Sequence, residues 1–289
     1  MKFALFSGSA PEWTPAELAA KLAEQGWDGV EWRVTDQKPS EEPGFWAGNL
    51  ATYPLTGLED ELAAIREVTA GAGLGFAGIA GYVAISDLEN AERIIAATSA
   101  LGAERVRLNV PKAAPGSDYR ALFDATKSAA GQVAEIAARH GVQVVIQIHH
   151  GNIVSTASAA VRLLDGLDPA HIGVIHDLGN LTIEGREGLQ SHTPGLQIIR
   201  DYLAHVHVKN AVWKPAETRE DGTVDWAWEW APLKSGLGDL PGYIGSLVEV
   251  GYEGWVTVEN FLTGVPTEER LRGDLEYLKS AYDAAARPR

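Results

Sequence analysis

The sequence predicts a single (β/α)8 TIM barrel, in which eight parallel strands close into a cylinder surrounded by eight helices. Short apolar runs rich in β-branched residues alternate with longer stretches of helical periodicity along all 289 residues. Eight runs of each kind give about 36 residues per unit, which is normal for this barrel. No shift in composition marks a domain boundary, so we expect one domain over residues 1–289. A doubly wound open sheet is the alternative. No GxGxxG or P-loop motif follows any strand, so we expect no nucleotide cofactor.

The first helix has the clearest start, because Thr14 precedes Pro15, and Glu17 lies three residues after Thr14, as in a capping box. Glycines end the first, third and fourth helical stretches at Gly26, Gly102 and Gly141, where left-handed backbone can close a helix. The predicted strands cover residues 2–7, 27–34, 73–79, 105–110, 142–149, 172–177, 203–208 and 255–259. The predicted helices alternate with them and cover residues 15–25, 58–70, 88–101, 119–140, 157–167, 194–202, 243–250 and 268–285.

The composition excludes several classes of protein. Lys and Arg number 24 against 39 Asp and Glu, a net charge of −15, so nucleic acids and anionic membrane surfaces are poor partners. The absence of cysteine excludes disulfides, thiolate nucleophiles and iron–sulfur clusters. No apolar run approaches the roughly 20 residues of a membrane-spanning helix. The start, MKFALFSGSAPEW, lacks the apolar segment of a signal peptide, so we expect a cytoplasmic protein.

Two connections are too long to be simple turns, and both carry aromatic side chains. Residues 35–56 follow the second predicted strand, and residues 210–241 follow the seventh. In a barrel both would emerge at the C-terminal face, where the active sites of this fold lie. They serve either as a lid or pocket wall, or as a contact between copies of the chain in a homo-oligomer. Their aromatic residues include Phe45, Trp46, Tyr53, Trp213, Trp226, Trp228 and Trp230.

Polar groups end four consecutive strands, the fifth to the eighth, at the same level of the predicted barrel. Alternation along each strand places these groups at the same depth in the barrel. They are Gln147 and His149 on the fifth strand, Asp177 on the sixth, His205, His207 and Lys209 on the seventh, and Glu259 on the eighth. Two carboxylates and an imidazole at the end of an apolar barrel need compensation. A divalent cation would supply it, and mixed oxygen and nitrogen donors suit Mn²⁺, Mg²⁺, Co²⁺ or Zn²⁺. A salt-bridged polar layer without metal is the alternative.

These strand ends resemble the xylose isomerase-like TIM-barrel superfamily, in its sugar phosphate isomerase/epimerase group. The motifs that carry the resemblance are DGVE at 28–31, IHDLGN at 175–180, LTIEG at 181–185, HVHVKN at 205–210 and GYEGWVTVEN at 251–260. The resemblance covers most of the chain, although residues 210–241 fit no motif. It implies one divalent metal ion, held by Asp177, His207, Glu259 and the residue at the end of the fifth strand.

That fifth-strand position is glutamate in the family and Gln147 here. An amide oxygen can bind a hard cation, but it brings no charge and cannot act as a base. The two-carboxylate mechanism of the family's ketose 3-epimerases therefore does not carry over, and Glu259 remains as the carboxylate base. His149 becomes the second acid/base candidate or a substitute ligand. A neutral histidine that hydrogen-bonds a sugar hydroxyl is the alternative for His149.

Five further side chains are expected to bind the substrate. They are Glu31, Arg33, Asn109, Asn180 and Lys209. Glu31, Arg33 and Asn109 end the second and fourth strands, and Asn180 stands where related epimerases often have a substrate-binding residue. Lys209 would stabilise developing negative charge or bind a carboxylate or phosphate of the substrate, unless it is a solvated lysine at the barrel rim.

The resemblance implies an enzyme, namely a metal-dependent isomerase or epimerase of a sugar, sugar phosphate or polyol-derived carbonyl compound. It would remove a proton next to a metal-bound carbonyl of a small carbohydrate-like substrate. The main alternative is a lyase that dehydrates inososes or eliminates an aglycone from a 3-keto-glycoside, because one carboxylate base suffices for elimination. The superfamily's abasic-site endonucleases use histidines on early strands, and the third and fourth strands have none here. Gln147 leaves one more alternative, a binding subunit without catalytic activity.

Overall fold

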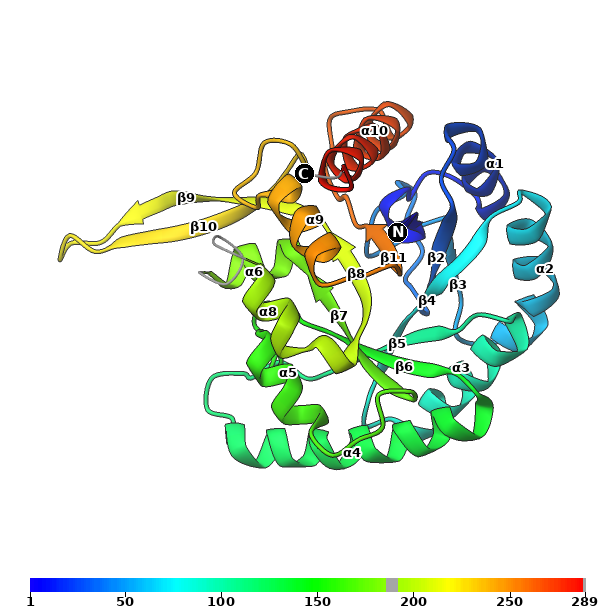
Figure 1. Ribbon diagram of the computed structural model, residues 1–289, viewed down its shortest axis with the longest axis horizontal. Coiled ribbons are helices and arrows are strands. Elements are labelled where there is room, and N and C mark those ends of the chain that lie inside the picture. The colour runs from blue at the N-terminus through cyan, green and yellow to red at the C-terminus, as the bar shows by residue number, and fades with distance from the viewer. Residues whose placement is uncertain (186–191, 288–289) are drawn as a thin grey trace.

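Eight parallel strands close into a barrel in the computed structural model, which describes residues 1–185 and 192–287 (Figure 1). Strand β1 pairs with both β2 and β11, which closes the cylinder and excludes an open sheet. The predicted fold class is therefore confirmed. The barrel strands are β1 (Lys2–Phe6), β2 (Gly29–Val34), β4 (Gly75–Ala84), β5 (Arg105–Asn109), β6 (Gln143–Gln147), β7 (Ile172–Asp177), β8 (Leu203–Val208) and β11 (Trp255–Val258). The short β3 (Thr52–Tyr53) pairs alongside β2.

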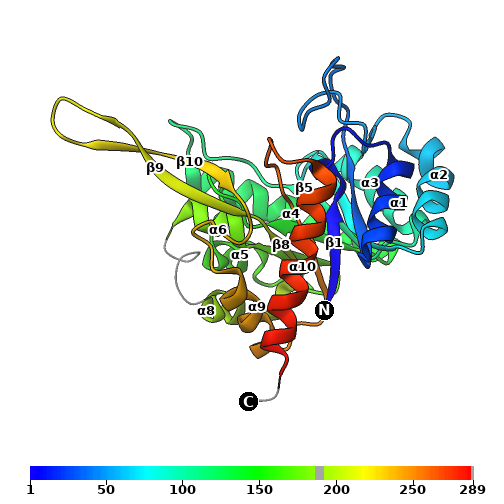
Figure 2. The same ribbon diagram turned by 90° about the horizontal axis from the view of Figure 1, so that it is seen from above.

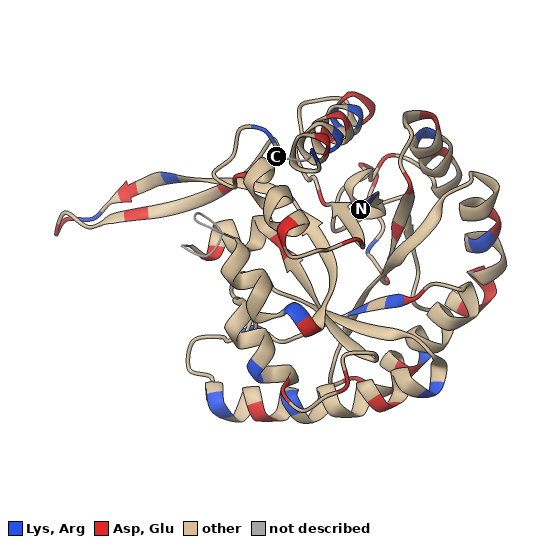
Figure 3. Ribbon diagram, in the orientation of Figure 1, with Lys and Arg blue, Asp and Glu red and all other residues tan. Residues whose placement is uncertain are grey.

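Helices cover the outside of this barrel, as Figures 1 and 2 show. The helices are α1 (Pro15–Gln25), α2 (Leu58–Gly71), α3 (Leu88–Leu101), α4 (Tyr119–His140), α5 (Ala157–Leu164), α6 (Leu178–Glu184), α8 (Thr193–Ile198), α9 (Leu240–Glu249) and α10 (Thr267–Ala285). Lys, Arg, Asp and Glu are spread over these outer helices and the projecting hairpin (Figure 3). Among the described helices, none is both long enough and apolar enough to cross a bilayer.

Helix ends follow the predicted capping chemistry. The backbone N–H of Thr14 donates to Glu17 Oε2 at 2.8 Å, and the Thr14 side chain accepts from the N–H of Glu17, so both halves of the capping box form. Gly26, Gly102 and Gly141 close their helices with φ of 82°, 75° and 66°, a backbone conformation that favours glycine.

The predicted helices 194–202 and 243–250 need adjustment, and one further helix was not predicted. The predicted helix 194–202 is the shorter α8 followed by a 3₁₀ turn at Arg200–Tyr202. Helix α9 begins before residue 243, because Asp239 accepts the N–H of Gly242 at 3.0 Å and caps the helix. Helix α6, which was not predicted, starts directly after β7.

An antiparallel hairpin occupies most of residues 210–241, so the prediction of a long loop there is wrong. Its strands are β9 (Asn210–Thr218) and β10 (Val224–Ala231), and it projects well beyond the barrel (Figures 1 and 2). In β10, Trp226, Trp228 and Trp230 alternate with less apolar residues. Such a period of two is typical of a strand and is the signal that the sequence analysis missed.

Gly179 allows α6 to follow β7 so closely. A Cβ atom at this position would overlap Lys209 Cγ and lie 2.9 Å from the Lys209 carbonyl oxygen. We predict that Gly179→Ala lowers the free energy of unfolding by about 1–3 kcal/mol, measured by urea denaturation. The matched control is Gly245→Ala in α9, where the added Cβ meets no described atom within 4 Å. The control should keep its stability or gain up to about 1 kcal/mol, and equal losses in the two variants would contradict the packing argument.

Candidate functional site

The four residues named as metal ligands meet at one end of the barrel. Gln147 and Asp177 end β6 and β7, and the strand register places Asp177 beside His207 of β8. The Gln147 amide nitrogen lies 2.6 Å from Asp177 Oδ2, 2.9 Å from His207 Nδ1 and 3.4 Å from Glu259 Oε2. Asp177, His207 and Glu259 are buried, and each offers one ligand atom within 4.8 Å of the others. Segments more than 80 residues apart in sequence (177 to 259) therefore supply one polar cluster.

Lys209 belongs to the same cluster. Its ammonium donates to Asp177 Oδ2 at 2.6 Å and also hydrogen-bonds Glu259 Oε2, and the side chain is buried. Burial alone would lower the pKa of Lys209, but the carboxylates of Asp177 and Glu259 raise it above its usual value. Lys209 is therefore a charged, buried residue, and the reading of it as a solvated rim lysine is wrong.

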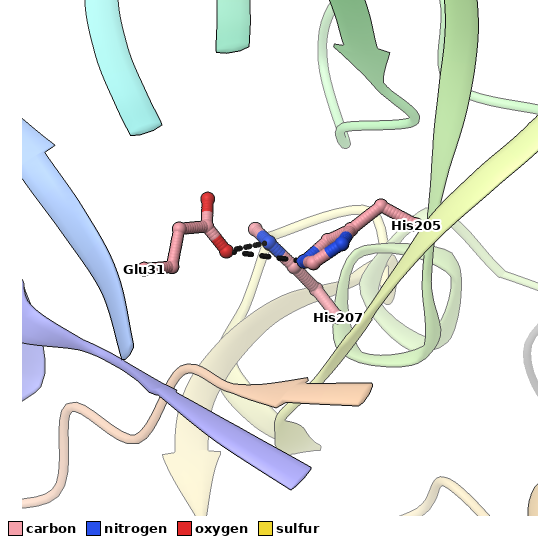
Figure 4. Close-up of side chains that lie close together, drawn as sticks. All are labelled: Glu31, His205 and His207. Carbon is pink, nitrogen blue, oxygen red and sulfur yellow. Dashed lines mark hydrogen bonds and ion pairs between the residues drawn. The ribbon is translucent and has the colours of Figure 1, made fainter. Parts of the chain in front are cut away.

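A second group of side chains supports His207 from the other side (Figure 4). His207 Nε2 donates to Glu31 Oε2 at 2.8 Å, and His205 Nε2 lies 3.2 Å from the same oxygen and 2.9 Å from Thr257 Oγ1. Burial would lower the pKa of His207, but the carboxylates of Glu31 and Glu259 raise it to about 9. For the carboxyl group of Glu31 burial acts in the opposite direction and would raise the pKa. His207 and His205 nevertheless hold that pKa far below its usual range. Glu31 thus orients His207.

The cluster balances its charges with its own side chains. Glu31, Asp177 and Glu259 carry negative charge, and Lys209, Arg107 and protonated His207 oppose them. Arg107 Nη1 lies 3.5 Å from Glu259 Oε1 and donates to Gln147 Oε1 at 3.2 Å. Burial would raise the pKa of Glu259, but Lys209, His207 and Arg107 hold it well below its usual value. Unpaired charges at this depth would be costly, so the pairing is a condition of the fold.

The donor set fits a divalent cation. Asp177 and Glu259 offer carboxylate oxygens and His207 offers Nδ1, while Glu31 accepts the Nε2 proton of His207, an arrangement common for histidine ligands. Gln147 turns its amide nitrogen toward the cluster and its oxygen toward Arg107, so it would have to rotate to act as a ligand. A bound cation would also displace the Lys209 ammonium and the second proton of His207. A bound metal ion and a salt-bridged layer are therefore alternative ways to balance the negative charge of the same carboxylates.

A cavity of about 700 Å³ opens above this cluster. Gln147, Lys209 and Glu259 line it, together with Phe45 and Trp46 from residues 35–56. Trp228 and Trp230 of the hairpin also line it. Trp226, nearer the start of β10, is not among the described lining residues and is 58% exposed. Both long connections therefore act as walls of the cavity.

The remaining predicted site residues divide into two groups. Asn109 and His149 line the cavity. Asn180 is fully buried and donates to Asp177 Oδ2 at 2.8 Å, so it positions a carboxylate. Arg33 stacks 4.5 Å from the ring centre of Phe45 and hydrogen-bonds the Phe45 carbonyl oxygen. Glu31, Arg33 and Asn180 are absent from the described residues that line the cavity, so their predicted contact with substrate is not supported by where they lie.

Sequence reasoning missed Arg107, Tyr82 and Phe261, which also line the cavity. Arg107 had a signal, because it lies two residues before Asn109 and shares its face of β5. Tyr82 of β4 and Phe261 after β11 had none, since a lone aromatic residue near a strand end is usually part of the core.

Comparisons with known proteins identify the family of the fold. Residues 19–281 match the family described as "Xylose isomerase-like TIM barrel". The chain is 26% identical over 136 residues to an inosose dehydratase of Geobacillus thermodenitrificans, which covers 44% of this chain and 43% of that protein. The chain thus aligns with less than half the length of that curated relative.

Two solved structures share the fold. One is the 3-keto-D-glucoside 4-epimerase YcjR from E. coli, with a TM-score of 0.70 and 18% identity over 97% of this chain and 99% of that one. The other is the IOLI protein with a bound zinc atom, with a TM-score of 0.73 and 16% identity over 99% of each chain. At these identities the likeness concerns the fold.

Lys209→Met tests whether ammonium and metal compete for the same oxygens. Because the variant keeps the side-chain length but removes the charge, Asp177 and Glu259 should bind Mn²⁺ about tenfold more tightly or better, measured by isothermal titration calorimetry. Lys112→Met is the control, since Lys112 lines the same cavity without an ion pair to Asp177 or Glu259 in the described structure. Unchanged or weaker Mn²⁺ binding by Lys209→Met would show that the metal ion and the Lys209 ammonium do not compete for these oxygens.

His149 gives the fold a pH dependence. Burial, followed by the charge of Lys209, lowers the pKa of His149 to about 4. The unfolded chain, with a histidine pKa near 6.5, takes up this proton first, so stability falls as the pH drops from 6.5 toward 4. Between pH 7 and pH 5 the unfolding free energy of chelator-treated wild type should fall by more than that of His149→Gln. We predict a difference of about 2 kcal/mol between the two. Urea denaturation at both pH values measures it, and an equal loss in wild type and variant would contradict the assignment.

Proposed function

The chain belongs to the xylose isomerase-like TIM-barrel family, and on that basis we propose that it is a divalent-metal-dependent isomerase or epimerase. The substrate would be a small carbohydrate-like carbonyl compound: a sugar, a sugar phosphate or a polyol derivative. One observation carries the proposal: Asp177, His207 and Glu259 converge from three strands, and Glu259 faces a cavity large enough for such a molecule. The 3-keto-D-glucoside 4-epimerase that shares the fold supports this class of reaction.

Asp177, His207 and Glu259 would hold the cation, with the Gln147 oxygen as a fourth donor after rotation of its amide. A divalent cation in this place would supply positive charge beside the substrate's carbonyl oxygen. The bound zinc of the IOLI protein, which shares the fold, supports a metal here without fixing which ion it is.

Glu259 would accept the proton from the carbon next to the carbonyl. The low pKa of Glu259 keeps it ionised, so the form that accepts a proton is present at neutral pH, although the same low pKa makes the carboxylate a weaker base. Its position on the cavity wall gives it access to the substrate. Arg107, 3.5 Å from Glu259 Oε1, would stabilise the negative charge around it, since a bound cation takes the place of the Lys209 ammonium and the second proton of His207.

His149 is the candidate for the second proton transfer. It lines the cavity, and a proton delivered to the face opposite Glu259 would have to come from its protonated form; its pKa of about 4 favours the neutral form near pH 7, which can accept a hydrogen bond from a sugar hydroxyl. The Nδ1 atom lies 2.8 Å from the carbonyl oxygen of His150, which fixes the ring orientation.

Elimination is the second candidate reaction. Gln147 stands where a second carboxylate base would be. Among the described residues that line the cavity, Glu259 is the one carboxylate. One base is sufficient to start an elimination next to a carbonyl, whereas epimerisation needs a second group on the opposite face. The sequence similarity to an inosose dehydratase favours the same reaction.

Solvent deuterium exchange tests both reactions at once. In Mn²⁺-loaded protein, at least one of a panel of ketoses, inososes and 3-keto-glycosides should incorporate deuterium next to its carbonyl, detected by NMR. Glu259→Gln should slow the exchange by about 10²–10⁴-fold, because it removes the base. Glu253→Gln is the control, since Glu253 is exposed and outside the cavity lining.

A chelator should stop the exchange, and restored Mn²⁺ should recover it. Retention of exchange in Glu259→Gln would refute the assignment of the base. Exchange that persists in metal-free protein would refute the metal requirement. Deuterium in a product that has lost water or an aglycone would identify the lyase.

A further inference from the structure

Six aromatic rings form a continuous belt in the wall of the cavity. In order, the belt consists of Tyr82, Trp46, Phe45, Phe261, Trp230 and Trp228, all of which line the cavity. Successive ring centres are 6.2, 4.5, 4.7, 5.4 and 4.8 Å apart, so each ring contacts the next. The belt continues to His150, whose ring lies 5.0 Å from Trp228.

The belt is assembled from separate parts of the chain. Residues 35–56 supply Phe45 and Trp46, β4 supplies Tyr82, and β10 supplies Trp230 and Trp228. Phe261 follows β11 and joins the two sides, since it contacts both Phe45 and Trp230. Two elements that extend the simple barrel thus meet around the cavity to present aromatic surface.

One charged side chain, Arg33, holds one side of the belt in place. The Arg33 guanidinium lies 4.5 Å from the ring centre of Phe45, 5.8 Å from that of Trp46 and 4.9 Å from that of Tyr82. Arg33 also donates to the carbonyl oxygen of Phe45, so loop and rings share one anchor. Trp46 nevertheless remains 71% exposed and Trp228 is only partly buried. Ordered aromatic rings that remain open to solvent beside a cavity are suited to contact a ligand.

The cavity therefore has two zones. Gln147, Lys209 and Glu259 form the polar zone, and the belt forms an aromatic zone that adjoins it, since Lys209 Nζ lies 5.7 Å from the ring centre of Trp230 and 6.0 Å from that of Phe261. The polar side chains of Asn109, Lys112 and Asn152 also line the cavity. A volume of about 700 Å³ is within the roughly 300–1,000 Å³ of pockets for ligands larger than a single six-membered ring.

We propose that the substrate is a glycoside, with a second ring that stacks within the aromatic belt while its reacting sugar lies on the polar cluster. The identity of the reacting end rests on the proposed function. Aromatic faces are electron-rich, so they attract the C–H groups on the face of a sugar ring or the edge of an aromatic aglycone. Asn109, Lys112 and Asn152 would bind the hydroxyls around the second ring.

Calorimetric binding to Mn²⁺-loaded protein tests the proposal without turnover. The probes are methyl and phenyl β-glycosides of glucose and galactose, with cellobiose and lactose. We expect a phenyl glycoside or a disaccharide to bind about tenfold more tightly than the methyl glycoside of the same sugar. Preference for the phenyl compound identifies an aromatic aglycone, and preference for the disaccharide identifies a second sugar.

Two belt variants and one control locate the effect. Trp228→Ala and Trp46→Ala, on opposite walls, should each remove most of the second-ring advantage while methyl glycoside binding changes little. Trp226→Ala on the same strand should keep the advantage, because Trp226 is outside the described cavity lining. Since Trp46 is largely exposed, its loss should not unfold the protein, which a thermal melt verifies.

Equal affinity for methyl, phenyl and disaccharide probes, or no binding of any of them, would overturn the proposal. Equal effects of Trp226→Ala and Trp228→Ala would overturn it too. Deuterium exchange of small ketoses without a second-ring preference would leave the proposed function intact and remove only this inference. A second-ring preference without deuterium exchange of any carbonyl substrate would leave the aromatic subsite intact and count against the proposed function.

Discussion

Compensation of buried negative charge is the constraint on which the rest of the site depends. Glu31, Asp177 and Glu259 are each at most 3% exposed at the end of an apolar barrel, and carboxylates at that depth must be neutralised. Lys209 bridges Asp177 and Glu259, His207 links Glu31 to Glu259, and Arg107 approaches Glu259 from β5. A divalent cation would satisfy the same oxygens. The chain thus has its own cations in the place where the family resemblance implies a metal, so binding of that metal would be an exchange of one set of positive charges for another.

The barrel explains why this exchange can occur at one point. Parallel strands end at a common level, so β6, β7, β8 and β11 deliver Gln147, Asp177, His207 and Glu259 together although they are distant in sequence. Surrounding contacts limit where each group can move: Asn180 holds Asp177, Glu31 holds His207, and Gly179 leaves room for Lys209. The elements added to the barrel do different work. Residues 35–56 and the β9–β10 hairpin place aromatic walls over the polar cluster, so the proposed chemistry and the proposed recognition of the substrate would be supplied by different parts of the fold.

Periodicity in the sequence was sufficient for the barrel. Every predicted strand is present, and the capping box at Thr14 and the glycine caps form as expected. Alternation along the strands also predicted that Asp177, His207 and Glu259 would converge. The hairpin was missed because its tryptophans, set among acidic residues, resembled an irregular loop, although they alternate with a period of two. The burial and orientation of individual side chains could not be predicted either. Glu31 in β2 and Asn180 in α6 were expected to bind substrate, yet tertiary packing turns them toward His207 and Asp177. The ion pairs of Lys209 likewise depend on distances between strands that no local pattern records.

Anomalous diffraction from crystals grown with Mn²⁺ tests the central claim most directly. The account predicts one strong peak within coordination distance of Asp177, His207 and Glu259, with the Lys209 ammonium withdrawn from the two carboxylates that it now bridges. Crystals with saturating Mn²⁺ in which Lys209 still joins Asp177 to Glu259, and in which no peak lies between these side chains, would contradict it. The cluster would then be a permanent salt-bridged layer, and the proposed metal-dependent chemistry would have no place in this barrel.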